Sequence, residues 1–159
     1  MEKIKFSAKI KAPREKVWNV LWDDTTYRMW TSAFSEGSYA VSDWKEGSKV
    51  LFLSADGNGM YSTVVKSIPN EFISFKHLGE VKNGKEEPLN EETKKWSGSF
   101  ENYTLKEAGE ETELTIEMDI AEDYFDYFNK TFPKALEKIK ELAEDVTIPA
   151  NVSGEHVNQ

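Results

Sequence analysis

The sequence of 159 residues contains no cysteine and only two histidines, His77 and His156. The missing thiols exclude a cysteine nucleophile, cysteine-ligated zinc and a disulfide framework, and they fit a reducing compartment. Two histidines so far apart are also a poor basis for a zinc or iron site, because carboxylates would have to supply most of the ligands. We therefore predict no metal and no cofactor.

Nucleophilic catalysis has little support in the sequence either. A serine-histidine-acid triad would have to combine His77 with a serine such as Ser74 or Ser99 and a carboxylate from another strand. No spacing in the chain indicates such an arrangement. We assign no catalytic residue from the sequence.

Basic residues and long apolar runs are also scarce. Lysine and arginine together number 20 against 29 acidic residues, which gives a net charge of −9. This charge repels phosphate backbones and anionic lipid surfaces, so we expect neither nucleic acid nor a membrane as a partner. The N-terminal residues 1–6 alternate charged with apolar side chains, so we expect neither a signal peptide nor a membrane anchor there. We expect a cytoplasmic protein.

Aromatic residues, in contrast, are abundant. They make up 13% of the chain and include five tryptophans, within an apolar content of 38%. That content is sufficient for the core of one domain of this size. We predict a single domain over residues 1–145, followed by a C-terminal tail over residues 146–159, in a monomer or a homodimer.

Residues 122–145 form the longest periodic segment and predict an amphipathic helix. Large apolar residues recur at steps of three or four and are Phe125, Phe128, Phe132, Leu136, Ile139 and Leu142. Burying each contributes roughly 1.5–3 kcal/mol, so the rest of the chain must cover this stripe. Pro133 lies inside it and predicts either a bend or a helix in two segments.

The residues before this helix read mostly as strands. Apolar and polar residues alternate in segments that we assign to strands at residues 2–11, 38–42, 49–54, 60–68, 72–81, 96–107 and 112–120. Two short helices are predicted after the first strand, at residues 13–22, with Pro13 in the first helical position, and at residues 27–30. Residues 82–95 lack periodicity and predict a mobile loop. Residues 56–59 predict a tight turn rather than a calcium loop, because no acidic residues follow.

The order of these elements predicts the fold. One strand, two short helices, six further strands and a long helix indicate an α+β protein with a curved antiparallel sheet of about seven strands. Because sheets twist, consecutive hairpins curl and leave a concave side that the long C-terminal helix can fill. The two short helices would close one end.

Several local motifs, taken in order, resemble the START-like, Bet v I-like superfamily. They are Ala12-Pro13, Val17-Trp18, Tyr27 to Trp30, Gly37-Ser38, Asp43-Trp44, Gly47, Ile68-Pro69, Glu101 to Leu105, Thr112 to Leu114 and Phe132 to Leu136. Within it, the chain is most similar to proteins like the activator of the heat-shock protein 90 ATPase, over about residues 2–145. The resemblance implies a helix-grip fold with a cavity for hydrophobic small molecules. It says less about activity, because relatives include carriers, receptors, cyclases and co-chaperones.

Glu101 is the most informative polar residue, because strand alternation places it on the same side as Ser99, Tyr103 and Leu105. If that side faces the helix, Glu101 enters an apolar cavity, where it can orient a ligand or act as a general acid or base. The alternative is that the strand faces the other way, or that Glu101 pairs with a lysine at the sheet edge.

The ligand-binding residues that we predict combine this strand with aromatic residues that lie where the helices and the loop meet. They are Trp30, Phe75, His77, Trp96, Glu101, Tyr103, Phe128 and Phe132. Trp30 has the alternative role of a plug that closes the grip, and Phe128, like Phe125, Leu136 and Ile139, has the alternative role of plain core.

The function that we predict is the non-enzymatic binding of a hydrophobic or aromatic small molecule between the long helix and the sheet. One alternative is an interaction module that docks on a chaperone partner through its acidic surface. Another is a cyclase or hydrolase that uses Glu101 with Tyr103.

Overall fold

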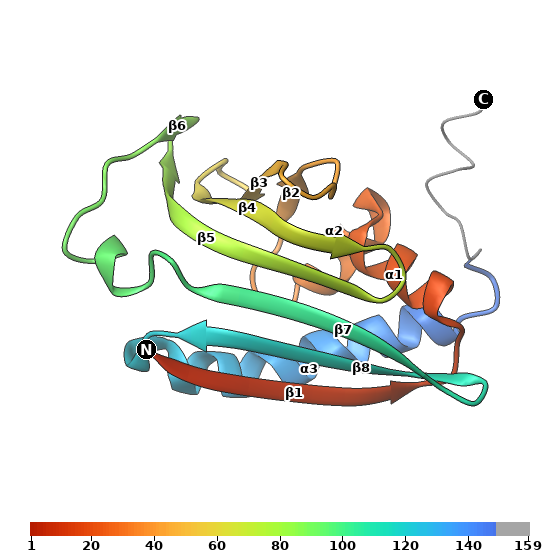
Figure 1. The fold of residues 1–159 in the computed structure, drawn as a ribbon. Helices are drawn as coiled ribbons and strands as arrows, with labels where there is room; N and C mark the ends of the chain where they lie inside the picture. Colours follow the sequence, from red (N-terminus) through yellow and green to blue (C-terminus); the bar gives the residue numbers. More distant parts are fainter. Residues whose placement is uncertain (149–159) are drawn as a thin grey trace, which may run out of the picture.

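A computed structural model describes residues 1–148 of the chain (Figure 1). Most of the predicted tail, His156 included, lies outside the described residues. The elements follow in the order β1 (Glu2–Ile10), α1 (Arg14–Trp22), α2 (Asp24–Thr31), β2 (Tyr39–Val41), β3 (Lys49–Leu53), β4 (Gly59–Ile68), β5 (Phe72–Lys82), β6 (Lys85–Glu86), the 3-10 helix η1 (Thr93–Lys95), β7 (Phe100–Ala108), β8 (Glu111–Ile120), the 3-10 helix η2 (Glu122–Tyr124) and α3 (Phe125–Glu144).

The strands form one antiparallel sheet in the order β1-β8-β7-β5-β4-β3-β2, with the short strand β6 paired to β5. This confirms the α+β helix-grip fold, with eight strands instead of about seven. The additional strand is β6, which lies inside the predicted loop of residues 82–95 together with η1. β6 consists of two residues, each paired with one residue of β5. It was not predicted because an alternating pattern cannot be recognised over two residues.

The helices lie on one side of the sheet, with α3 behind β7, β8 and β1 and the two short helices beside it (Figure 1). α3 continues through Pro133 as one helix, so it is not divided into two segments. The Lys16 ammonium of α1 donates a hydrogen bond of 2.5 Å to the Asp145 carbonyl, directly after the last turn of α3. A cation at the C-terminal end of a helix donates to an otherwise unpaired carbonyl and interacts favourably with the negative end of the helix dipole.

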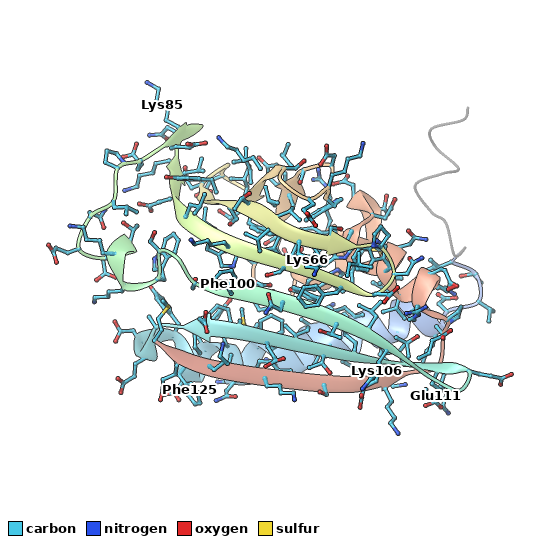
Figure 2. The ribbon with its side chains drawn as sticks, viewed as in Figure 1. Lys66, Lys85, Phe100, Lys106, Glu111 and Phe125 are labelled. Atoms are coloured by element: carbon cyan, nitrogen blue, oxygen red, sulfur yellow. The ribbon has the colours of Figure 1, made fainter. Side chains whose placement is uncertain are left out.

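The core lies between α3 and the inner face of the sheet. Leu136, Ile139 and Leu142 of α3 are buried, and the Phe132 ring stacks on Phe6 of β1 with ring centroids 5.0 Å apart. The outer face of the sheet carries charged side chains, among them Lys66 and Lys106 (Figure 2). The sheet therefore has one apolar and one solvated face, as expected for antiparallel strands.

Most predicted boundaries differ from the structure by one residue or more. α1 begins at Arg14, so Pro13 is the residue before the helix and not its first position. α2 spans Asp24–Thr31 because the Asp23 carboxylate accepts a hydrogen bond from the Thr25 amide and starts the helix earlier than predicted. Trp96 follows η1 and lies outside the strand assigned to it, since β7 begins at Phe100.

Candidate functional site

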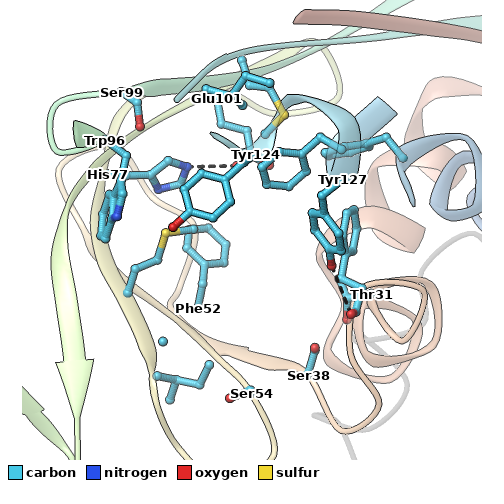
Figure 3. A pocket seen from close by; sticks show the side chains of 18 of the residues that line it. Thr31, Ser38, Phe52, Ser54, His77, Trp96, Ser99, Glu101, Tyr124 and Tyr127 are labelled. Atoms are coloured by element: carbon cyan, nitrogen blue, oxygen red, sulfur yellow. Dashed lines mark hydrogen bonds and ion pairs between the residues drawn. The ribbon is translucent and has the colours of Figure 1, made fainter. Parts of the chain in front are cut away.

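A cavity of about 470 Å³ lies between the sheet, α2 and the N-terminal end of α3 (Figure 3). His77, Trp96 and Ser99 lie on one side of it, and Thr31 and Tyr127 lie on the other. Its wall is mostly aromatic, with the rings of Trp22, Tyr27, Trp30, Phe34, Phe52, Trp96, Tyr103, Tyr124, Tyr127, Phe128 and Phe132. Such a wall favours flat apolar ligands.

Three polar side chains of the wall form one hydrogen-bonded group across β5 and β7. The Glu101 carboxylate is paired through Oε1 with His77 Nε2 at 2.9 Å and accepts the Tyr103 hydroxyl through Oε2 at 2.5 Å. Only 13% of the Glu101 side chain is exposed. The strand therefore faces the cavity, and the alternative in which Glu101 pairs with a lysine is wrong.

The group ends in a buried serine that sequence reasoning missed. Ser62 Oγ of β4 lies 2.7 Å from His77 Nδ1, so serine, histidine and glutamate form a chain across three strands. Ser62 is 1% exposed and is not part of the cavity wall. Because a nucleophile must reach its substrate, this serine serves to orient the His77 ring rather than to attack a ligand.

Two buried tyrosines lie close to the Glu101 carboxylate. Burial, followed by the negative charge of Glu101, raises the pKa of Tyr27 far above its ordinary value. Burial also raises the pKa of Tyr103, and the charge of Glu101 and its hydrogen bond act in the same direction. Both phenols are therefore neutral, and the Tyr103 hydroxyl acts as a hydrogen-bond donor at neutral pH.

The start of α3 forms the partly open side of the cavity. Tyr124 and Tyr127 remain 39% and 45% exposed, and the Tyr127 hydroxyl donates a hydrogen bond of 3.2 Å to the Phe34 carbonyl. The Phe34 ring also packs edge-on against Phe132 with ring centroids 4.9 Å apart. Residues after α2 and the first turns of α3 thus meet over the cavity.

The structure brings seven of the eight predicted site residues to the cavity wall, namely Trp30, His77, Trp96, Glu101, Tyr103, Phe128 and Phe132. Phe75 is not part of the wall. It is fully buried and packs against Trp22, with ring centroids 5.3 Å apart. Trp30 lines the cavity, is 2% exposed, and donates a hydrogen bond of 3.1 Å from its indole to the Leu21 carbonyl of α1.

Several wall residues carried no separate prediction, among them Trp22, Tyr27, Phe52 and Tyr124. Tyr124 had a usable signal, because it precedes Phe128 by four residues and therefore extends the same helical stripe. Phe52 had no such signal. The inner face of its strand becomes clear only from the pairing of β3 with β4, and the sequence does not reveal that pairing.

The described part of the chain contains neither a metal-binding cluster nor a membrane-spanning helix. Within residues 1–148, no three histidine, aspartate or glutamate side chains lie close enough together to hold a metal ion. None of the helices in the described part of the chain is long and apolar enough to cross a lipid bilayer.

Comparison with solved structures finds the same fold in bacterial proteins. Protein MLL2253 from Mesorhizobium loti superimposes with a TM-score of 0.70 at 16% identity, over 89% of this chain and 96% of that protein. The Aha1 dimer from Colwellia psychrerythraea gives 0.68 at 21% identity, over 91% and 97%. CalU16 from Micromonospora echinospora gives 0.63 at 17% identity, over 98% and 84%. At identities this low, the likeness shows a shared fold alone.

The sequence itself also matches a protein family. No curated protein matches the chain. The family model for "Activator of Hsp90 ATPase homolog 1-like protein" matches residues 11–144, from the end of β1 to the end of α3. Because this match covers most of the chain and the helix-grip fold agrees with it, the protein belongs to the family of activator of Hsp90 ATPase homolog 1-like proteins, within the START-like, Bet v I-like superfamily.

Proposed function

We propose that this protein binds a hydrophobic or aromatic small molecule in the cavity between α3 and the sheet, without chemical conversion of the ligand. Residues 1–145 would act as one domain. The observation that carries the proposal is the aromatic cavity itself, whose volume of about 470 Å³ lies in the range of about 300–1,000 Å³ typical of small-molecule sites.

The polar group in the wall supports binding with a fixed orientation. A mostly apolar pocket gains affinity from burial and gains orientation from a few polar contacts. Glu101, His77 and Tyr103 supply such contacts at one place in the wall. Since their serine partner is buried outside the wall, the same group lacks the accessible nucleophile that a hydrolase of the serine type needs.

Tryptophan fluorescence can test the proposal directly, because Trp22, Trp30 and Trp96 are part of the wall. Titration with flavone, as a neutral aromatic probe, or with a long-chain fatty acid is expected to give a saturable change in emission for at least one of them. The absence of a saturable response to either probe would reject the proposal.

A matched pair of substitutions on α3 locates the binding site. Phe128 lines the cavity and Phe125 does not, although both are half-buried phenylalanines of the same helix. Phe128→Ala is expected to weaken flavone binding about tenfold, because truncation removes part of the burial energy of a phenylalanine. Phe125→Ala is expected to leave the affinity unchanged. Equal losses in the two variants would argue for binding elsewhere.

A second candidate function is docking on a chaperone, which the family match favours. In that case the acidic surface would contact the partner, since the chain carries a net charge of −9. Measurement of ATP turnover by heat-shock protein 90 at saturating concentrations of this protein separates the two functions. Unchanged turnover would remove the chaperone function and leave ligand binding unaffected.

A further inference from the structure

The charged residues of the cavity wall are almost all of one sign. The wall contains three carboxylates, on Glu80, Glu101 and Asp119. Among the described residues that line it there is no lysine and no arginine, and the one basic side chain is that of His77. A ligand in this cavity therefore meets negative charge without a permanent positive charge beside it.

Two of the three carboxylates retain capacity for a ligand. Asp119 is neutralised, because it pairs with the Lys3 ammonium at 3.1 Å and accepts the Phe100 amide at 3.1 Å. Glu80 is half-buried, and its carboxylate has no hydrogen bond or ion pair within residues 1–148.

Glu101 can accept further hydrogen bonds in its present geometry. It uses one position on each oxygen, for His77 and for Tyr103. A carboxylate offers about four lone-pair positions, so about two remain for a donor in the cavity. A carboxylate that is mostly shielded from water binds a charged donor more tightly than a neutral one, because the attraction between opposite charges is stronger at the lower dielectric constant of a buried site.

The aromatic part of the wall has the same preference. The face of an aromatic ring carries partial negative charge and attracts a cation that lies over it. Trp96, Phe52 and Tyr124 line the cavity together with Glu101. Carboxylates and ring faces around one space are the combination that binds ammonium groups, and they repel carboxylate ligands.

We propose that the cavity selects ligands that carry a protonated amine on an aromatic or apolar body, with the ammonium group hydrogen-bonded to Glu101. This inference rests on the proposed binding function and specifies its ligand class. The charge of the whole protein, −9, acts in the same direction, since it raises the concentration of cations at the surface and lowers that of anions.

Three probes of one size and shape separate the two proposals. They are 1-naphthylmethylamine, which is a cation at pH 7, 1-naphthalenemethanol, which is neutral, and 1-naphthoate, which is an anion. Calorimetric titration of the full chain at low salt is expected to give an affinity about tenfold higher for the amine than for the alcohol, with the anion weakest. Equal affinities, or a preference for the anion, would overturn the amine proposal and leave the binding function standing. If none of the three binds, the amine proposal fails, and the flavone titration decides the binding function separately.

Substitution of Glu101 identifies the group responsible. Glu101→Gln removes the charge and keeps the shape, so we expect the preference for the amine over the alcohol to fall about tenfold. Glu107→Gln is the matched control, because Glu107 lies on the same strand, is exposed and does not line the cavity. The control is expected to change neither affinity.

A second substitution covers the case in which Glu101→Gln disturbs the fold, because Glu101 supports two neighbours. The Glu80 carboxylate has no hydrogen-bonding partner within residues 1–148, so Glu80→Gln is expected to leave the circular dichroism spectrum unchanged. The substitution is expected to reduce the amine affinity about two- to threefold. An amine preference that remains at full strength in both variants would overturn the assignment to these carboxylates.

Discussion

At the scale of single residues, Glu101 is a polar side chain that interacts with other polar residues of the cavity wall. It contacts His77 on the neighbouring strand and Tyr103 two residues along its own strand, and its charge acts on the buried phenol of Tyr27. Each contact fixes one ring of the wall in place. The polar group therefore orders the aromatic surface as well as offering a site for a ligand.

The buried tyrosines predict a loss of stability at high pH. The pKa values of Tyr27 and Tyr103 are raised in the folded protein, whereas an unfolded tyrosine titrates near pH 10. Above about pH 10 the unfolded chain has lost these protons and the folded chain keeps them, so the free energy of unfolding falls as pH rises. The slope reaches about 1.4 kcal/mol per pH unit for each such tyrosine, and below pH 9 the contribution is fully present.

Comparison of Tyr27→Phe with the unsubstituted protein tests how much Tyr27 contributes to this slope. The Tyr27 hydroxyl has no hydrogen-bonding partner within residues 1–148, so the substitution removes the titration without breaking a bond. Urea denaturation of the two proteins from pH 9 to pH 11 is expected to give a shallower decline for the variant, and parallel stability between pH 7 and pH 9. Identical slopes above pH 10 would contradict the raised pKa of Tyr27.

At the scale of elements, the long helix and most strands could be predicted because each has a clear period. The stripe on α3 contains enough large apolar residues to define its buried side, and Leu136, Ile139 and Leu142 are buried accordingly. On β8, Leu114 and Ile116 alternate with polar residues and are buried as expected. Periodicity reports which residues share a face, which is sufficient for the fold class.

Periodicity does not report which face is inside or how two strands align, and the site depends on both. Alternation placed Glu101 beside Tyr103 but left open whether the pair faces the cavity. Ser62 reaches His77 because the register of the β4–β5 pairing shifts between Tyr61 and Ser62, an irregularity that no local pattern marks. The partners of the polar group therefore required the structure.

At the scale of the whole molecule, α3 divides the interior into a closed and an open part. The C-terminal half of α3 packs tightly, with Ile139 fully buried. The N-terminal half lies over the cavity, where Phe128 is half-buried and Tyr127 is exposed. Packing without voids stabilises the fold. The residues around a space of about 470 Å³ lack part of these packing contacts, but the space leaves room for a ligand. Stability and binding thus depend on different ends of one helix.

Ile139→Ala tests this division against Phe128→Ala. Because Ile139 is fully buried, its truncation leaves a cavity in tight packing and is expected to lower the free energy of unfolding by about 2–5 kcal/mol, measured by urea denaturation. The affinity of the folded variant for flavone is expected to stay unchanged, whereas Phe128→Ala lowers affinity and costs less stability. If Ile139→Ala does not fold, Ile139→Val makes the same comparison at about 0.5–1.5 kcal/mol. A loss of affinity in the Ile139 variants equal to that of Phe128→Ala would show that the two halves of α3 are not independent.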